Sequence, residues 1–178
     1  MSARFERLDA RTIFEGAVVE VREGRFRYED GDVVTRQWVV HPGSVGIVAH
    51  DGEHVWLVRQ PREATGEPDL LELPAGKLDE PGETPLECGM RELGEEIGKS
   101  AATWEHLATF FTSPGFSDER CHLYLATDLD DAPDRSTSGE RIDVEPQPLA
   151  TLDATIANCR DAKTIIGLQI LRSRLSGA

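Results

Sequence analysis

The most constraining feature of the sequence is a strongly marked helix over residues 84–98. Thr84 is a good N-cap, Pro85 suits the first helical position, and Glu87 follows Thr84 by three residues, as in a capping box. Gly98 is placed to end the helix. Apolar side chains recur at helical spacing along it, at Leu86, Met90, Leu93 and Ile97. This narrow stripe predicts a helix that packs one face on a sheet.

Two glycines lie inside this helix and weaken it. Gly89 and Gly94 each cost about 1 kcal/mol relative to alanine in a helix interior. They predict either close packing against a neighbouring element or an unusually weak helix.

Strand patterns lie on both sides of the helix. The first forty residues alternate as a small antiparallel meander with a turn at 29–32. Asp51-Gly52 joins two apolar runs as a hairpin. The remaining expectations are strands at 45–49, 55–60, 70–73, 107–111, 121–126 and 142–149, an exposed loop at 128–141 and a closing helix at 161–175. This order predicts α/β or α+β layers.

The composition limits what the chain can bind. Its 178 residues carry 33 acidic and 19 basic side chains, a net charge of −14 with histidine neutral, and fit one compact domain. Without a basic cluster, this charge argues against nucleic acid and anionic membranes as partners. No run approaches the roughly 18 apolar residues of a membrane span, and the first ten residues do not resemble a signal peptide. We therefore expect a soluble, cytoplasmic protein.

The three cysteines argue against a disulfide framework or a zinc site. Cys88, Cys121 and Cys159 are odd in number, widely spaced and without a CxxC pair. They predict reduced, mostly buried thiols.

Acidic residues crowd the segment that contains the helix. Between Asp79 and Glu96 there are seven carboxylates and one basic residue, Arg91. Glu92 and Glu96 share a helix face, and Glu95 lies beside them. Hard oxygen ligands of this kind suit Mg²⁺ or Mn²⁺ when substrate phosphates complete the shell. The alternative is a solvated glutamate face in which Arg91 is only an ion-pair partner of Glu87 or Glu95.

The spacing in this region resembles the Nudix box, the signature of Nudix hydrolases. It runs from Gly76 through Glu83 to Arg91-Glu92-Leu93-Gly94-Glu95-Glu96-Ile97-Gly98. The gap after Gly76 is one residue longer than in the commonest form, and Lys99 replaces an apolar residue. The lead-in at 58–62 and 70–78, Pro114 sixteen residues after Gly98, and the segment 160–168 resemble the ADP-ribose pyrophosphatase subgroup.

The resemblance implies a fold and an assembly. The fold is α/β: the Nudix fold, a mixed sheet between helices, preceded by an N-terminal antiparallel β-meander. Residues 1–41 would form that N-terminal sheet and residues 42–178 the Nudix hydrolase domain. Relatives use the N-terminal sheet to form homodimers, so a homodimer is implied, and exposed aromatic residues in it are compatible with one.

The resemblance also implies hydrolysis of the pyrophosphate of ADP-ribose, or of a related nucleoside diphosphate sugar, to AMP and ribose 5-phosphate. Mg²⁺, or alternatively Mn²⁺, would be the cofactor. The Ala75 carbonyl, Glu92 and Glu96 would be metal ligands, with Glu95 helping. Arg91 would orient a glutamate, and Glu83 would brace the loop before the helix.

Other roles implied by the resemblance fall outside the box. The general base would be Glu140, in the loop before the last strand, or its rival Glu119. Arg36 and Arg62 would hold phosphate or the terminal ribose, and Phe116 or Trp38 would stack on adenine. Glu72 is a better match than Asp69 for contacts to hydroxyls. The alternative function is a non-catalytic Nudix domain that binds ADP-ribose or a related nucleotide as a sensor.

Overall fold

A computed structural model of the chain describes residues 4–133 and 141–177. The chain divides into two compact units, which we call unit 1 and unit 2. Unit 1 comprises Met1–Pro42 and Phe111–Arg120, and unit 2 comprises Gly43–Phe110 and Cys121–Ala178. The sequence boundary after residue 41 left residues 111–120 in the second domain, whereas their contacts group them with unit 1.

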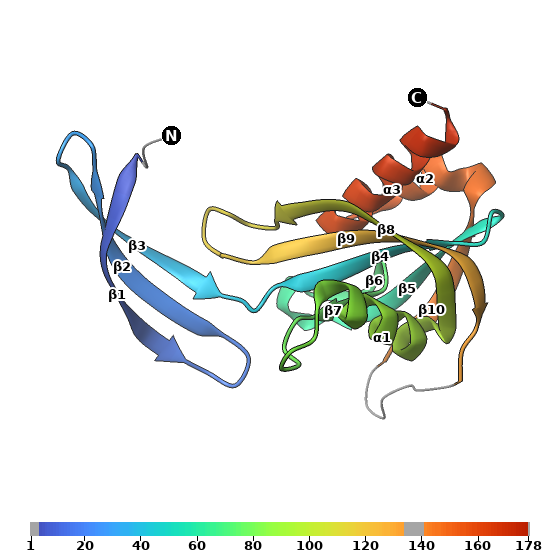
Figure 1. Cartoon of the computed structure of the whole chain (residues 1–178), viewed down its shortest axis with the longest axis horizontal. Helices are drawn as coiled ribbons and strands as arrows, with labels where there is room; N and C mark the ends of the chain where they lie inside the picture. The colour runs from blue at the N-terminus through green and yellow to red at the C-terminus, as the bar shows by residue number, and fades with distance from the viewer. Residues whose placement is uncertain (1–3, 134–140, 178) are drawn as a thin grey trace. The chain divides into compact units, whose positions relative to one another are not determined.

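Unit 1 is built on a three-stranded antiparallel sheet with the order β1-β2-β3. The strands are β1 (Phe5–Glu15), β2 (Glu20–Tyr28) and β3 (Val33–Val40) (Figure 1). The meander is as predicted, but β1 was not expected as one of its strands. The alternation at Val21 and at Phe26, expected as two separate strands, lies in the single strand β2. Because β1 is almost wholly exposed, it lacks the apolar alternation that identifies a strand.

Hydrogen bonds join the segment 111–120 to the end of β3 and the residue that follows it. The amide of Val39 donates to the carbonyl of Phe116 at 2.8 Å, and the amide of His41 donates to Oδ1 of Asp118 at 2.9 Å. These contacts explain why a segment more than 70 residues away in sequence belongs to unit 1.

Unit 2 contains a seven-stranded mixed sheet. Its main path is β10-β5-β4-β9-β8, with β6 paired to β5 and β7 paired to β4. The strands are β4 (Ser44–His50), β5 (His54–Arg62), β6 (Glu67–Glu72), β7 (Ala75–Lys77), β8 (Lys99–Phe111), β9 (Arg120–Asp131) and β10 (Asp143–Pro148). The pair β4–β9 is parallel, and the pairs β4–β5, β5–β6, β4–β7 and β5–β10 are antiparallel. The predicted hairpin between β4 and β5 is confirmed.

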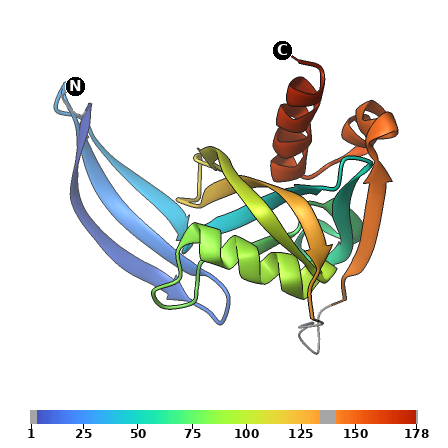
Figure 2. The same ribbon diagram turned by 45° about the vertical axis from the view of Figure 1, so that its right-hand side comes forward.

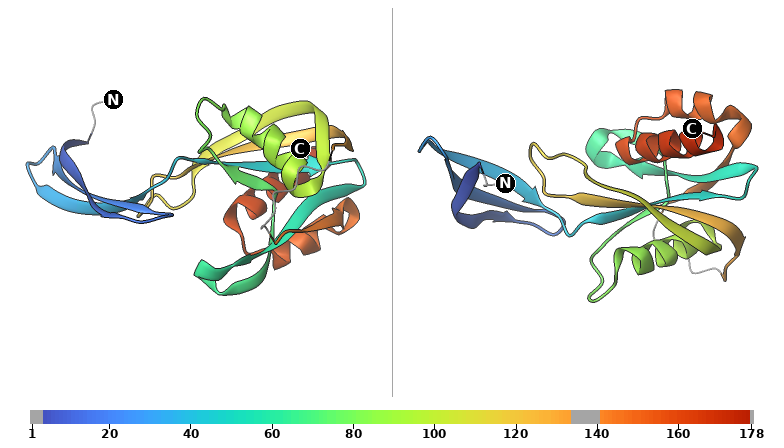
Figure 3. Two further views of the ribbon diagram at one scale, coloured as in Figure 1. Left: turned by 90° about the horizontal axis from the view of Figure 1, so that it is seen from below. Right: turned by 45° about the horizontal axis from the view of Figure 1, so that its top comes forward.

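Helices cover both faces of this sheet. They are α1 (Pro85–Ile97), α2 (Leu152–Asn158) and α3 (Ala162–Leu175), with short 3₁₀ turns at Glu63–Thr65 and Leu149–Thr151. Figure 3 shows α1 on one face and the pair α2–α3 on the other, and Figure 2 shows α1 running along the sheet. The helix α2 was not predicted, because two turns are too short for a readable periodicity.

Alternate side chains of the central strand β4 pack into two separate hydrophobic cores, one on each face of the sheet. In β4, Val45, Ile47 and Ala49 pack with α1, whereas Val48 packs with α2 and α3. All four side chains are fully buried. A strand buried on both faces reads as a continuous apolar run, as the sequence shows at this point.

Several boundaries differ from those predicted, among them the start of β8, which lies at Lys99 rather than at residue 107. Residues 74–76 were expected to stop the strand predicted at 70–73, yet Ala75–Lys77 form β7, in which Ala75 pairs with Gly46 of β4. The loop expected at 128–141 begins later, because β9 continues to Asp131; residues 134–140 lie outside the described residues. No helix in the described ranges has the length and apolar character needed to cross a membrane.

Candidate active site

The helix α1 begins and ends as its sequence predicts. The amide of Thr84 donates to Oε2 of Glu87 at 2.8 Å, and the amide of Glu87 donates to the hydroxyl of Thr84 at 3.3 Å. Gly98 adopts a φ of 65°, and its amide caps carbonyls of the last turn. Both predicted boundaries are confirmed.

The buried face of α1 is shifted from the predicted stripe. Met90 was expected to pack on the sheet but is 46% exposed, whereas Cys88 and Gly89 are buried beside Leu93 and Ile97. A Cβ added to Gly89 would lie 3.3 Å from Cγ2 of Val45. Of the two explanations predicted for the glycines in this helix, close packing and a weak helix, close packing accounts for Gly89.

Arg91 is the centre of the charge network on α1. Its Nε and Nη2 bind the two oxygens of Glu83 at 2.9 and 3.1 Å. Its Nη1 donates to Oε1 of Glu92 at 2.8 Å and to Oε2 of Glu95 at 3.0 Å. These carboxylates raise the pKa of Arg91, with Glu83 the largest cause, and Arg91 in turn lowers the pKa of Glu83. The arginine thus joins the loop before α1 to two of its glutamates.

Two contacts attach the glutamates of α1 to the strand β7. The amide of Ala75 donates to Oε2 of Glu96 at 2.9 Å. A Cβ built on Gly76 would lie 1.9 Å from Oε1 of Glu92, so only glycine lets the carboxylate lie against the backbone there. Glu92, Glu96 and the Ala75–Gly76 backbone are therefore brought together, as the predicted metal site requires.

The donor chemistry of this group fits a hard divalent cation. Glu92, Glu95 and Glu96 offer only oxygen atoms, and each carboxylate has lone pairs beyond those used by Arg91 or Ala75. Within residues 4–133 and 141–177, no three His, Cys, Asp or Glu side chains already stand in a ligating arrangement. The carboxylates are instead held by protein N–H donors.

Cys88 lies beside this network but does not have the properties of a nucleophile. Its side chain is fully buried, and burial raises the pKa of its thiol to about 12. A thiol with this pKa is protonated at neutral pH and unreactive. Cys88, Cys121 and Cys159 are all buried and form no disulfide within the described residues, as the sequence predicts.

A second charge cluster lies directly before β7. Glu72, only 1% exposed, accepts hydrogen bonds from Nε and Nη2 of Arg62 at 2.6 and 3.0 Å. It is also hydrogen-bonded to the ammonium group of Lys163, which lies 3.1 Å from Oδ2 of Asp161. The structure thus joins Arg62 and Glu72, both predicted to contact substrate, in one ion pair, of which Glu72 is the buried partner.

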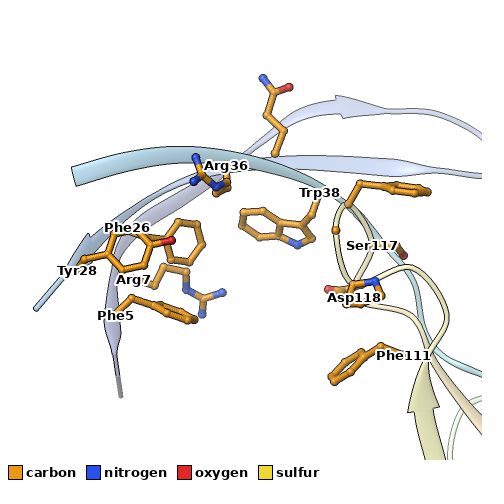
Figure 4. Close-up of a pocket in the computed structure, with 13 residues that line it drawn as sticks. Phe5, Arg7, Phe26, Tyr28, Arg36, Trp38, Phe111, Ser117 and Asp118 are labelled. Carbon is orange, nitrogen blue, oxygen red and sulfur yellow. The ribbon is translucent and has the colours of Figure 1, made fainter. Parts of the chain in front are cut away.

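Other predicted substrate residues meet in a pocket of unit 1 (Figure 4). The pocket has a volume of about 520 Å³, and its lining includes Arg36, Trp38 and Phe116. Phe26 contacts Trp38 edge to face, with ring centroids 6.1 Å apart. Arg7 and Arg36 supply positive charge beside these rings (Figure 4). Such a lining suits a flat aromatic group that carries negative charge.

The structure describes only one of the two residues predicted as general base. Glu119 belongs to unit 1, where its carboxylate accepts the hydroxyl of Thr112 at 2.7 Å and lies 3.9 Å from Nδ1 of His41. Glu140 lies outside the described residues.

Sequence reasoning missed several residues that the structure places beside the site. Lys163, Asp161 and Thr164 were noted only as part of a segment typical of the subgroup. Gln60 was also part of a motif, and its Nε2 is buried without a hydrogen-bond partner in the part of the chain that the structure describes. Gln60 and Lys163 both lie among polar and charged neighbours, so no local sequence signal marks either of them as buried.

Comparison with known proteins gives a family and relatives. A family model described as the NUDIX domain matches residues 40–165. An ADP-ribose pyrophosphatase of Mycobacterium tuberculosis is 44% identical over 126 residues, which is 70% of this chain and 60% of that protein. The chain therefore spans less than two thirds of the length of that relative.

Two further relatives align over nearly their whole length. A methanol dehydrogenase activator of Bacillus methanolicus is 36% identical over 97% of this chain and 96% of its own. An ADP-ribose pyrophosphatase of Bacillus subtilis is 35% identical over 90% of this chain and 88% of its own.

A solved structure supports the fold. It is described as an ADP compounds hydrolase, has a TM-score of 0.86 and 23% sequence identity, and the match covers 98% of this chain and 95% of that one. With the mixed sheet between helices, this match confirms the predicted fold class.

Proposed function

The chain belongs to the Nudix family, and from this premise we propose that it hydrolyses the pyrophosphate of ADP-ribose, or of a related nucleoside diphosphate sugar. The proposed products are AMP and ribose 5-phosphate. Two relatives are named ADP-ribose pyrophosphatases, and one of them aligns over nearly the whole chain.

One observation carries the proposal. Glu92 and Glu96 project from α1 and lie at the start of β7, where the Ala75 amide donates to Glu96 at 2.9 Å and Gly76 leaves room for Glu92, and Glu95 is held beside them by Arg91. A row of carboxylates against a strand backbone would be costly in a protein of net charge −14 unless cations offset it. A pyrophosphate substrate needs those cations.

The proposed cofactor is Mg²⁺, with Mn²⁺ as the alternative. The Ala75 carbonyl, Glu92 and Glu96 would hold it, with Glu95 helping. When bound, a divalent cation neutralises phosphate charge and lowers the pKa of a water. Arg91 fixes the orientation of Glu92 and Glu95 through its hydrogen bonds at 2.8 and 3.0 Å.

The remaining roles belong to groups outside α1. Arg62 would bind phosphate or the terminal ribose, and Arg36 would neutralise charge in the pocket of unit 1. In that pocket Trp38 or Phe116 would stack on adenine. A carboxylate not engaged by metal must accept the proton of the attacking water, and Glu140 and Glu119 are the two alternatives.

We also propose that the protein is a homodimer. Large apolar side chains of unit 1 are exposed, among them Phe5 at 52% and Phe14 at 55%. Sedimentation analysis would test this assembly, with a purely monomeric species as the contrary result.

The test is turnover of a panel of nucleoside diphosphate sugars, led by ADP-ribose and including GDP-mannose. Each is assayed with Mg²⁺, with Mn²⁺ and with chelator, and the products are separated by chromatography. Glu96→Gln should lower turnover by about 10³-fold, because it removes a charged metal ligand. The matched control is Glu105→Gln, whose exposed carboxylate pairs with Arg174 and whose loss should leave turnover unchanged.

The same experiment separates the proposed function from its alternative. If ADP-ribose binds but no substrate is hydrolysed with any metal, the catalytic proposal fails and a nucleotide-binding sensor replaces it. The relative named a methanol dehydrogenase activator favours adding an arm in which a dehydrogenase is assayed with and without this protein. If turnover occurs, Glu119→Gln and Glu140→Gln identify the general base by the larger loss of kcat.

A further inference from the structure

The most unusual buried charge in the described residues is Lys163, in the first turn of α3. Its side chain is 15% exposed and lies between two carboxylates, those of Glu72 and Asp161. Glu72 is 1% exposed, so this is an interior ion pair. Burial lowers the pKa of Lys163, but the two carboxylates outweigh it and the net shift is upward. The lysine is therefore charged at neutral pH.

A buried ion pair of this kind adds little to the free energy of unfolding. Taking two charges out of water costs about as much as their attraction returns, and an apolar pair of similar volume is often as stable. A buried pair next to a site is better explained by what it holds in place.

The cluster holds Arg62. Glu72 grips the guanidinium through Nε and Nη2 at 2.6 and 3.0 Å, which is a bidentate geometry that fixes its direction. The side chain of Arg62 remains 42% exposed, and Nη1 makes no hydrogen bond within the described ranges. Glu72, which holds Arg62, lies three residues before Ala75, whose amide donates to Oε2 of Glu96 at 2.9 Å, so one short segment of chain carries both the partner of Arg62 and the contact with the glutamates of α1.

The same turn of α3 also fixes the chain that leads into β7. The hydroxyl of Thr164 accepts the amide of Leu73 at 2.8 Å and donates to Oδ2 of Asp161 at 2.6 Å. Asp161 therefore orients both Thr164 and Lys163. Two residues after Leu73, the chain reaches Ala75 and its contact with Glu96.

We propose that Lys163 is a positioning residue, which holds Glu72 so that Arg62 directs its remaining N–H groups at the phosphate oxygens of the substrate. This inference rests on the proposed function, since it names how that site recognises phosphate. Lys163 is not itself in contact with substrate in this proposal. It acts through Glu72, and Asp161 keeps its ammonium group in place.

The experiment compares Lys163→Met, Lys163→Arg and the double variant Glu72→Gln/Lys163→Met with the wild type. Lys163→Met should raise KM for ADP-ribose about tenfold while kcat changes less than about threefold, because binding rather than chemistry is affected. Lys163→Arg keeps the charge and should restore KM to within about threefold of wild type. Lys99→Met is the matched control, because Lys99 also pairs with an aspartate, Asp131 at 2.6 Å, and its KM should not change.

Phosphate dependence separates positioning from folding. In Lys163→Met the inhibition constant of ADP should rise about tenfold, whereas that of adenosine, which has no phosphate, should stay within about twofold. The double variant removes both buried charges, so its thermal stability should exceed that of Lys163→Met while its KM remains high. Equal weakening of ADP and adenosine, or a wild-type KM in the double variant, would overturn the proposal.

The experiment still tests the proposal if Lys163→Met fails to fold or if the wild type shows no turnover. If Lys163→Met does not fold, Lys163→Gln replaces it and the ratio of ADP to adenosine affinity is read in the same way. If the wild type hydrolyses nothing, the proposed function fails, and calorimetric binding of ADP and adenosine still decides whether Lys163 positions a phosphate-binding group.

Discussion

The Cα of Gly76 lies against the carboxylate of Glu92, so that a methyl group added there would fall 1.9 Å from Oε1 and 2.3 Å from Cγ. Gly76→Ala therefore forces Glu92 away from β7. Since a displacement of about 1 Å in a catalytic group costs about 100-fold in rate, we expect kcat to fall by about that factor. The Mg²⁺ concentration for half-maximal activity should rise, and a titration of activity against Mg²⁺ measures both.

Gly94→Ala is the matched control for that substitution, and it carries a prediction of its own. A Cβ at Gly94 would meet only the Lys99 carbonyl, at 3.8 Å, an ordinary contact. Alanine is favoured over glycine inside a helix by about 1 kcal/mol, so the melting temperature should rise by about 2–4 °C. Calorimetry at fixed pH measures it; a fall in melting temperature would mean that α1 needs this glycine for packing.

Thr164→Val should destabilise the protein by about 1–3 kcal/mol, because it leaves the buried amide of Leu73 without an acceptor. Thr164 is fully buried and is the acceptor of that amide at 2.8 Å. Thr164→Ser keeps the hydroxyl and should cost less than Thr164→Val. Urea denaturation of both variants tests this, and equal losses would contradict a role for the hydrogen bond.

The ion pairs of Glu72 should stabilise the fold in a pH-dependent way. Burial raises the pKa of this carboxyl, but Arg62 and Lys163 outweigh it, so the pKa in the folded protein is lower than in the unfolded chain. The contribution is thus present above the unfolded value of about 4.3 and is lost as pH falls through the folded value. Melting temperatures between pH 7 and pH 3 should drop less steeply in Glu72→Gln than in wild type; parallel curves would contradict this.

The native protein should be inert to thiol reagents. All three cysteines are buried and form no disulfide in the part of the chain that the structure describes, and the pKa values of Cys88 and Cys159 are raised, chiefly by burial. A disulfide reagent at pH 8 should label no thiol in native protein and three after denaturation. Rapid labelling together with loss of activity would show an accessible cysteine near the site.

Local signals predicted α1 because every determinant of that helix lies within fifteen residues of chain. Its cap, its end at Gly98 and its acidic row follow from side chains three or four positions apart. The error at Met90 has the same origin. Periodicity treats every apolar residue alike, and it cannot show that the sheet contacts Cys88 and Gly89 rather than the side chain next to them.

The rest of the site depends on contacts between distant residues. Nothing near Glu72 in sequence indicates that Lys163 neutralises it, and nothing near Trp38 indicates that residues 111–118 complete its pocket. An exposed strand also cannot be predicted from its pattern, since β1 buries almost nothing and has no apolar alternation. The sequence predicted Arg62 and Glu72 as two separate substrate residues but could not show that each holds the other.

The hydrogen bond from Leu73 to Thr164 joins residues that are 91 positions apart in the chain, so it cannot form until most of the chain has been synthesised. During synthesis, the glutamates of α1 leave the ribosome well before the first turn of α3 does. Until that turn arrives, Glu72 has no lysine partner and the Leu73 amide has no acceptor. Contacts of such long range form late, so the chain acquires a helix of correct shape first and a competent site only near the end of its folding.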